Sequence, residues 1–599
     1  MKKNIFFLLI AVAFIENSKA QSVAINNDAS NADASAVLDV KSTTKGMLIP
    51  RMMMAQRDAI AAPANGLLIY QTDNTTGFYF YNGSGWLSLA NSLSGWGTMG
   101  NTGTNPSTNF IGTTDINPLN FRINNQPAGI LDSFNVVAGK TFFGYASGKN
   151  NSGVNNTGYG FKSLTLNTIG DENVGIGSLS LRNNIDGSKN TALGYASLQN
   201  NTSGNSNVGL GNLALGGNTT GIENTAVGTS AMLGNQPGSY NTGIGSYALQ
   251  FSQSNGNTAI GSQAMFLTNS GNQNTAVGAS AMFLNTTGSG NVAIGVNTME
   301  KNTTGYSNVA VGMNALSKNT NRNNLVAIGD SALFNNGTGS MTSTSGTGNT
   351  AVGSKALYLN TSGQENSAFG FNALFNNTSG LRQTAIGYKA LYNNIDGDYN
   401  AALGYNSMFQ NTSGSYNASF GNFSLYNNVS GLYNAAFGYA ALNNNTTADN
   451  NSAFGNLSLA ANTTGADNAS FGHYALRNNV NGNQNSAFGT QALSVSLGFS
   501  NTAIGYQSLF KNSAGNNNTA VGAYADVSIS NLTNATAIGY TAKVTQSDAM
   551  MFGNVQVNKW GFGVTPGANR ALQVGTDASN GNGAYLTSAG VWTNVSDKN

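Results

Sequence analysis

A recurring order of polar, small and apolar positions around a glycine dominates the chain. The repeated pattern is close to Asn-Thr-Ala-Ile-Gly-Tyr-x-Ala-Leu-x-x-Asn-x-x-Gly, as in residues 383–397 and 501–515. The glycine that follows the apolar residue, here called the marker glycine, recurs 24 times from Gly144 to Gly539. Most of the intervals equal the one from Gly387 to Gly404, three are one position shorter, and one is longer because it holds a Gly/Ser/Thr-rich insertion. A period this strict predicts a stack of similar units, each in one fixed register with its neighbours.

Two apolar positions in each unit predict a core. The residue directly before the marker glycine is apolar or aromatic in every unit, and we expect its side chain to point inward. Examples are Ile386, Leu403, Phe420, Phe437 and Phe454. The residue four positions after the glycine forms a second anchor and is usually Leu or Met, as at Leu391, Met408, Leu425 and Leu442. Five consecutive units from Phe420 to Phe488 carry Phe at the first position, which predicts a better-filled core in that stretch.

Small and polar positions complete the unit. The residue two before the marker glycine is small in nearly every unit, as at Ala385, Ala402, Ser419 and Ala436. Because a small-residue stripe allows a neighbour to approach closely, we expect another protomer to pack against it. Asn stands four residues before the glycine in 20 of the 24 units, and stacked coils would align these amides into a hydrogen-bonded ladder.

The length of the unit favours an all-β parallel β-roll, or β-solenoid, over helical repeats. A helical repeat needs about 33 residues or more for two helices. Seventeen residues instead suit one coil made of two strands of about five residues and two tight turns. About 24 such coils, stacked at about 4.8 Å, would make a rod on the order of 115 Å long. Two apolar anchors per coil give a thin core, so the sequence predicts a homotrimer.

Composition excludes most enzyme chemistry. The chain contains no Cys and a single His, His473, so thiolate nucleophiles, disulfides and multi-His metal sites are ruled out. We therefore expect no enzyme activity, no catalytic residues, no cofactor and no metal. Only 8% of the residues are charged and the formal net charge is +2, which does not suit nucleic-acid binding.

The N-terminal segment 1–20 has the features of a signal peptide. Lys2 and Lys3 precede an apolar run from Ile5 to Ile15, and small residues around Ala20 mark a cleavage site. This run is too short to span a bilayer, and no later segment approaches the roughly 20 apolar residues that a membrane helix needs. The sequence thus predicts a secreted or bacterial cell-surface protein without an intrinsic membrane span.

The repeat resembles a known adhesin module. Asn-(Thr/Ser)-Ala-(Val/Ile)-Gly, as in residues 224–228, 257–261 and 274–278, is similar to the head repeat of trimeric autotransporter adhesins. The resemblance implies a left-handed parallel β-roll assembled as a homotrimer and a role in cell adhesion.

Residues outside the repeat divide into three further parts beyond the signal peptide of 1–20. Residues 21–90 form an N-terminal module with a hairpin of 67–70 and 78–81, and it resembles modules of secreted repeat proteins and tail-fibre-like proteins. Its Tyr70, Tyr79, Tyr81 and Trp86 could stack on sugars, but alternation along the hairpin favours core or trimer packing. Residues 91–140 are a β-rich connector, 141–553 the solenoid and 554–599 a C-terminal connector.

The C-terminal end is similar to the approach to an endosialidase-type intramolecular chaperone of phage tail spikes. In that family a Ser-Asp pair marks a self-cleavage site, and Ser596 and Asp597 match this pair. The resemblance implies a processing site at Ser596 and Asp597 and a chaperone domain after Asn599, where the Lys of the Ser/Lys dyad would fall.

Three functions remain open. A fibre or adhesin protomer that attaches to host or environmental glycans or surface proteins is favoured, because the repeat and both flanks indicate fibres. A phage-tail-spike-like carbohydrate-binding or carbohydrate-active fibre is the alternative, although Asp186, Glu223, Glu365 and Asp396 are scattered over turns rather than paired for catalysis. A surface-templating solenoid such as an ice binder would need unbroken Thr ranks, and the rank of Thr225 and Thr258 breaks at Val292.

Overall fold

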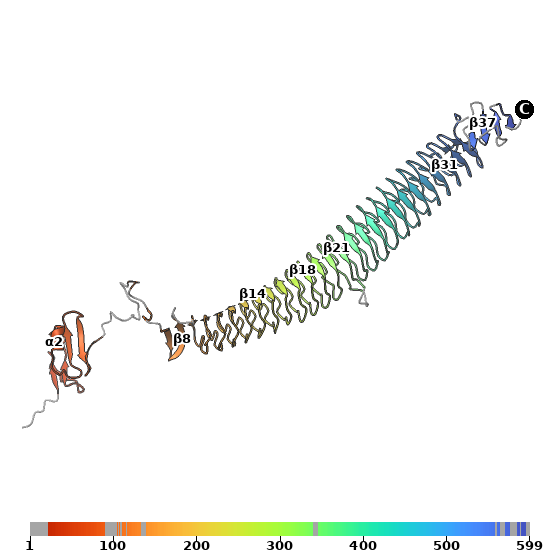
Figure 1. Cartoon of the computed structure of the whole chain (residues 1–599). Helices are drawn as coiled ribbons and strands as arrows, with labels where there is room; N and C mark the ends of the chain where they lie inside the picture. Colours follow the sequence, from red (N-terminus) through yellow and green to blue (C-terminus); the bar gives the residue numbers. More distant parts are fainter. Residues whose placement is uncertain are drawn as a thin grey trace, which may run out of the picture. The chain divides into compact units, whose positions relative to one another are not determined.

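The fold is seen in a computed structural model of the chain (Figure 1). The structure describes residues 22–89, 105, 107, 111–114, 117–132, 139–339, 345–556, 560–562, 570–574, 584–587 and 589–594. The chain divides into two units, residues 1–112 and 113–599. The predicted signal peptide and the proposed processing pair Ser596 and Asp597 lie outside the described residues.

The N-terminal unit is a small β module. β1 (Val23–Ile25) pairs with β2 (Leu38–Val40) in parallel. β3 (Arg51–Met52), β4 (Leu68–Gln71), β5 (Gly77–Tyr81) and β6 (Trp86–Ser88) form a four-stranded sheet, and the short helix α2 (Met54–Asp58) joins β3 to β4. The predicted hairpin is confirmed, since β4 and β5 are antiparallel with Ile69 opposite Tyr79.

The second unit is built around one long parallel stack. The antiparallel pair β7 (Leu119–Ile123) and β8 (Gln126–Leu131) leads into β9, and each later strand pairs in parallel with the equivalent strand one coil on, as Thr384 does with Ala401. The strands of the stack are β9 (Thr141–Phe143), β10 (Thr157–Tyr159), β11 (Val174–Ile176), β12 (Thr191–Leu193), β13 (Val208–Leu210), β14 (Thr225–Val227), β15 (Thr242–Ile244), β16 (Thr258–Ile260), β17 (Thr275–Val277), β18 (Val292–Ile294), β19 (Val309–Val311), β20 (Val326–Ile328), β21 (Thr350–Val352), β22 (Ser367–Phe369), β23 (Thr384–Ile386), β24 (Ala401–Leu403), β25 (Ala418–Phe420), β26 (Ala435–Phe437), β27 (Ser452–Phe454), β28 (Ala469–Phe471), β29 (Ser486–Phe488), β30 (Thr502–Ile504), β31 (Thr519–Val521), β33 (Thr536–Ile538) and β35 (Met550–Phe552).

The predicted parallel β-solenoid is confirmed, and the pairing of its strands has the period of the sequence repeat. β32 (Asp526–Val527) and β34 (Lys543–Val544) add a second short parallel pair beside its last coils. Four strands follow and form a separate sheet: β36 (Trp560–Phe562), β37 (Arg570–Val574), β38 (Ala584–Thr587) and β39 (Trp592–Asn594).

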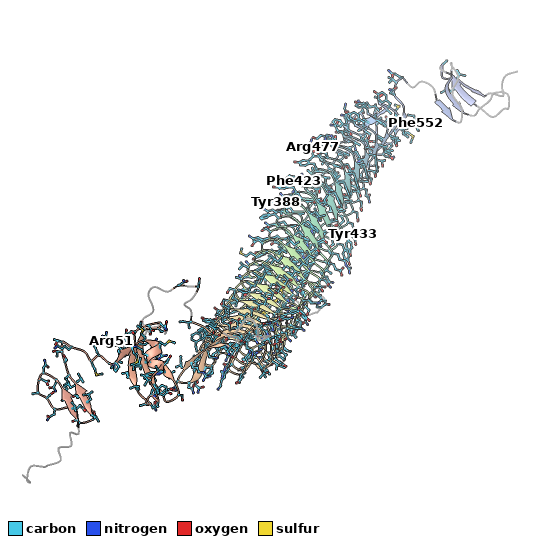
Figure 2. All side chains as sticks on the ribbon, turned by 60° about the vertical axis from the view of Figure 1, so that its left-hand side comes forward. Arg51, Tyr388, Phe423, Tyr433, Arg477 and Phe552 are labelled. Carbon is cyan, nitrogen blue, oxygen red and sulfur yellow. The ribbon has the colours of Figure 1, made fainter. Side chains whose placement is uncertain are left out.

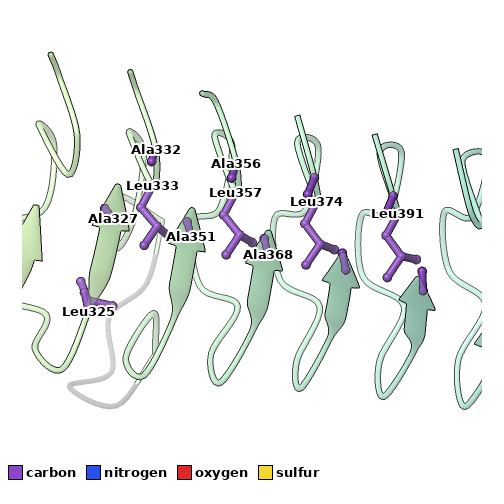
Figure 3. Packing of buried hydrophobic residues seen from close by; sticks show 14 of the residues in the cluster. Leu325, Ala327, Ala332, Leu333, Ala351, Ala356, Leu357, Ala368, Leu374 and Leu391 are labelled. Carbon is purple, nitrogen blue, oxygen red and sulfur yellow. The ribbon is translucent and has the colours of Figure 1, made fainter. Parts of the chain in front are cut away.

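The core of the solenoid differs from the prediction at one position. The anchor four residues after the marker glycine is buried as expected, and Figure 3 shows Leu333, Leu357, Leu374 and Leu391 in one column. The side chain that packs beside it comes from the small residue two before the glycine, such as Ala351 or Ala368. The large residue directly before the glycine points outward. The expectation that this residue fills the core was therefore wrong.

This orientation follows from the alternation of a strand. Gln383 and Ala385 are buried, so Ile386, the next residue, must face the opposite side of the strand. Two consequences correct the sequence analysis. The Phe residues from Phe420 to Phe488 do not widen the core, and the small residues Ala385, Ala402, Ser419 and Ala436 lie inside the protomer, where they cannot contact another chain.

The sequence predicted a second strand of about five residues in each coil. The structure has a run of turns there instead. Lys389 and Leu391 both have left-handed backbone conformations, with φ of 53° and 51°. Because the conformation alternates, Lys389 N–H donates to Phe371 of the preceding coil (2.9 Å), whereas Leu391 N–H donates to Ser407 of the following coil (3.0 Å). The strand side is shorter than predicted as well, with three residues per coil.

Each marker glycine is required by the closeness of the coils. Gly387 has φ of 133°, a region that residues with a side chain rarely adopt. A Cβ on Gly387 would lie closer than 3.0 Å to the carbonyl oxygen of Gly404 in the next coil. The strict recurrence of this glycine in the sequence therefore reflects both its dihedral angle and the direct stacking of backbones.

The predicted asparagine ladder is present inside the solenoid. Asn190 donates its backbone N–H and its side-chain amide to Oδ1 of Asn173 (3.0 and 3.1 Å), and the same amide donates to the carbonyl of Gly204 (2.8 Å). A second buried ladder comes from the Asn-x-x-Gly turn, where Asn201 Nδ2 donates to Asn184 Oδ1 (2.7 Å). Two ladders satisfy the turn carbonyls that the narrow core would otherwise leave without partners.

Candidate functional site

The outer surface of the solenoid carries one continuous apolar feature, here called the ridge. It consists of the residues directly before the marker glycines, one from each coil. Many of these side chains are between 36% and 44% exposed, and they include Ile176, Leu193, Leu210, Ile244, Ile260, Ile294, Ile328, Phe369, Ile386, Leu403, Phe420, Phe471, Phe488, Ile504 and Val521. Exposed apolar surface that continues without interruption over so many coils is typical of an interaction face.

The Phe block forms the most ordered part of the ridge. Phe420, Phe437, Phe454, Phe471 and Phe488 stack ring on ring, with centroids 4.7, 4.6, 4.7 and 4.8 Å apart and planes within 7° of parallel. This spacing equals the separation of neighbouring strands in a sheet. The rings therefore present a flat aromatic strip instead of filling the interior.

A second aromatic column follows the turn at the marker glycine. Six rings at the position five residues after the glycine stack in consecutive coils, with centroids 5.1 to 5.3 Å apart: Phe334, Tyr358, Phe375, Tyr392, Phe409 and Tyr426. All six are half-buried. The column ends at Tyr426, because the same position is Asn443 in the next coil and Ala460 in the one after.

A hollow of about 420 Å³ opens where this column ends. Phe423 and Tyr439 bound it on one side, Arg477 and Asn478 on the other, and Ala460 lies within its lining. Phe423 contacts Tyr439 edge to face, with ring centroids 6.1 Å apart. Figure 2 shows Phe423 and Arg477 along one edge of the solenoid and Tyr433 along the other.

The sequence analysis did not find this hollow. The signal was present as the residues Ala440, Ala460 and Ala461, which stand in two consecutive units where the flanking units carry larger side chains. That signal becomes visible only when it is known which positions point outward.

The aromatic residues of the N-terminal module are engaged with one another and with Arg57. Tyr70 packs edge to face on Phe78 (5.2 Å) and Tyr81 on Trp86 (5.5 Å). The Arg57 guanidinium lies over the ring of Tyr79 at 4.8 Å. Tyr70, Tyr79, Tyr81 and Trp86 are half-buried, an arrangement that suits packing within the module better than an open sugar platform.

One buried carboxyl stands out near the C-terminal end of the stack. Burial raises the pKa of Asp526 to about 6, although the backbone N–H groups of Val527 and Lys511 donate to it.

His473 is exposed and lies against Tyr474, with ring centroids 3.8 Å apart. Within the described ranges, no group of three or more His, Cys, Asp or Glu residues could hold a metal ion. In the same part of the chain, no helix has the length and apolar character needed to cross a bilayer.

A search of curated protein sequences found no match to this chain. Residues 24–107, which include most of the N-terminal module, match the family model of the phage tail like trimerisation region. This match and the β-solenoid together indicate a tail-fibre-like rod that assembles as a trimer.

Proposed function

We propose that the protein is a secreted, non-enzymatic fibre protomer that assembles as a homotrimer along its ridge and serves in attachment at the bacterial cell surface. The observation that carries this proposal is the exposed apolar ridge, which adds one outward apolar side chain per coil. The match to a trimerisation region at the N-terminal end supplies independent support for a threefold assembly.

The energetics of the ridge favour association. Covering the exposed part of an Ile, Leu or Phe side chain stabilises an assembly by roughly 1 kcal/mol. Repeated over more than twenty coils, even a fraction of this amount exceeds the cost of bringing three chains together, which is about 4–15 kcal/mol for each association step. Three identical faces that meet at one axis also satisfy the closed symmetry of most homo-oligomers.

The N-terminal module has a surface of the same character. Met47 and Leu48 are exposed beside Tyr70 and Phe78 in a shallow pocket of about 240 Å³. In the proposed trimer these side chains contact the equivalent modules of the other two protomers. The module would then begin the assembly and the ridge would continue it along the solenoid.

Light scattering on the full chain without its signal peptide tests the proposal. The wild-type protein should have three times the mass of one protomer. The triple variant Ile386→Asp, Leu403→Asp and Phe420→Asp places three carboxylates on the ridge. In a trimer each carboxylate would lose its water and would be repelled by the same carboxylate of the other two protomers. We expect this variant to weaken the trimer by more than tenfold in dissociation constant.

The matched control carries the same three charges away from the ridge. Ser379, Ser413 and Ser430 occupy outward turn positions of the same region, at the place where a neighbouring unit has Asp396. The variant with Asp at these three positions should remain trimeric. A monomeric wild-type protein, or a ridge variant as trimeric as this control, would overturn the proposed assembly.

The alternative function is a phage-tail-spike-like carbohydrate-binding or carbohydrate-active fibre. The hollow between Phe423 and Arg477 favours its binding form, because aromatic rings and amides line it together. Attachment to glycans and assembly along the ridge are compatible, since the hollow consists of residues that follow the marker glycine whereas the ridge residues precede it.

A further inference from the structure

We propose that the hollow between Phe423 and Arg477 is a binding site for an acidic saccharide. The inference deepens the proposed attachment function and rests on it, since it names the ligand class of one site on the fibre. Its volume of about 420 Å³ lies within the range of about 300–1,000 Å³ that small-molecule sites occupy.

The hollow arises because three columns of side chains lose their large members over two consecutive units. In the unit of Gly438, Ala440 and Asn443 already replace the rings of the aromatic columns. Leu457, Ala460 and Ala461 stand two, five and six residues after Gly455. In the unit of Gly421 the corresponding residues are Phe423, Tyr426 and Asn427, and in the unit of Gly472 they are Tyr474, Arg477 and Asn478. The two walls are three coils apart, which corresponds to about 14 Å between backbones and leaves room for one or two sugar rings.

One wall is aromatic. Phe423 contacts Tyr405, Tyr426 and Tyr439, with ring centroids 5.3, 5.8 and 6.1 Å away, so neighbouring rings hold it in place. The faces of aromatic rings carry partial negative charge and attract the slightly positive C–H groups on one face of a pyranose. A rigid ring at the edge of a polar hollow therefore suits a sugar better than a purely apolar ligand.

Amide groups in the lining of the hollow can supply hydrogen bonds to hydroxyls. Along the column six residues after the glycine, several amides donate to the amide of the next coil, as Asn393 Nδ2 does to Gln410 Oε1 (3.0 Å) and Asn427 Nδ2 to Asn444 Oδ1 (3.0 Å). Asn444 would donate in the same direction, but the next residue of the column is Ala461, which has no acceptor. Asn444 and Asn478 both line the hollow, so their amides are available to a ligand there.

Arg477 gives the site its charge preference. Its guanidinium lies over the ring of Tyr474, 4.6 Å from the centroid, and forms no ion pair among the residues that the structure describes. The neighbouring carboxylates Asp449 and Asp467 follow the second turn of their units, on a different side of the coil, where each accepts a hydrogen bond. A guanidinium fork held flat at the rim is well suited to the carboxylate of a uronic or sialic acid.

Saturation-transfer NMR on the full chain without its signal peptide tests the site, because it observes the ligand and tolerates a large protein. The probes are trigalacturonate and sialyllactose, each compared with its methyl ester, which keeps the shape and removes the charge. We expect at least one acidic probe to receive saturation and to bind about tenfold more tightly than its ester.

Two variants locate the binding. Ala460→Tyr places a ring in the hollow. The same position carries Tyr at Tyr392 and Tyr426, so the fold should tolerate the change, and we expect binding to be lost. Arg477→Gln should weaken the acidic probe about tenfold and leave the ester unchanged. Tyr433→Ala, on the opposite edge in Figure 2, is the matched control and should bind as the wild type does.

Each contrary result overturns the proposal. Saturation of neither acidic probe would refute the site, and undiminished binding by Ala460→Tyr would place the ligand elsewhere. Equal affinity for acid and ester, or no effect of Arg477→Gln, would refute the acidic class. Light scattering on the same samples separates this proposal from the proposed assembly, since a trimer that binds no saccharide contradicts only the site, and a monomer contradicts only the trimer.

Discussion

Asn400 and Asn417 occupy the same position in neighbouring coils, and Oδ1 of Asn400 accepts hydrogen bonds from both the backbone N–H (3.0 Å) and the side-chain amide (3.1 Å) of Asn417. Oδ1 of Asn417 accepts in turn from the backbone N–H of Asn434 (2.9 Å). All three side chains are buried. Each link therefore joins a coil to the next one, inside a core that has little apolar volume.

Breaking one link of this ladder should destabilise the protomer. Asn417→Ala leaves the buried N–H of Asn434 without a partner and opens a small cavity, so we expect the free energy of unfolding to fall by about 2–3 kcal/mol. Urea unfolding followed by circular dichroism measures the change. Asn269→Ala, at an exposed position, is the control and should stay within about 0.5 kcal/mol of wild type. Equal stability of the two variants would contradict a stabilising role for the ladder.

The sequence predicted the period, the ladder and the Leu/Met anchor correctly, because each depends on a residue type with one strong preference. It failed on the two adjacent positions Ala385 and Ile386. The interpretation assumed that the larger apolar residue fills the core, whereas strand alternation assigns Ala385 to the same face as the buried Gln383. The size of the side chain favoured Ile386 as the buried residue, whereas the alternation of the strand favoured Ala385. Over this three-residue strand, the alternation determines which side chain is buried.

Other features could not be predicted from residue preferences. Leu391 adopts φ of 51°, a conformation that leucine rarely takes, so nothing in the sequence indicated turns where a strand was expected. The hollow near Ala460 depends on which positions face outward. Once the ridge and the aromatic column are placed, the interruption at Ala460 and Ala461 can be read from the sequence alone.

The marker glycine offers a direct test of coil stacking. Gly387→Ala would place a Cβ closer than 3.0 Å to the carbonyl oxygen of Gly404, so the coils must separate, and we expect a loss of roughly 3 kcal/mol or more in unfolding free energy. Gly256→Ala is the control, because Gly256 also has positive φ but its nearest neighbouring atom would be 3.7 Å away. It should cost only about 1–2 kcal/mol. Hydrogen exchange should show the damage concentrated in the coils around residue 387, and uniform loss along the rod would argue against stacking as the cause.

Substitutions at two residues of one coil distinguish the contribution of the core to stability from that of the ridge. Leu459 is buried in the protomer, so Leu459→Ala should lower the unfolding free energy by about 2–4 kcal/mol at every protein concentration. Phe454 lies on the ridge, and Phe454→Ala should act mainly through the trimer. Its effect on the melting temperature should therefore depend on protein concentration. Thermal melts over a hundredfold range of concentration distinguish the two. A concentration-independent loss for Phe454→Ala would show that the ring stabilises the protein through its stacking on Phe437 and Phe471 and not through the trimer.

The buried carboxyl of Asp526 should make stability fall as the pH rises. Burial raises its folded pKa to about 6, whereas an aspartate in an unfolded chain titrates near 3.8. Between these values the folded protein holds a proton that the unfolded chain releases, so the stabilising contribution is complete below about pH 4 and lost as the pH passes 6. Asp526→Asn removes the charge and should raise the unfolding free energy by about 1–2 kcal/mol at pH 8, with little change at pH 4. Asp396→Asn, at an exposed turn, is the control for the general effect of removing a carboxylate. Because protonated Asp526 and its Asn replacement have the same charge, the unfolding free energies of the two proteins should converge at low pH. A constant difference between them from pH 4 to pH 8 would show that lost hydrogen bonds, and not the buried charge, cause the change in stability.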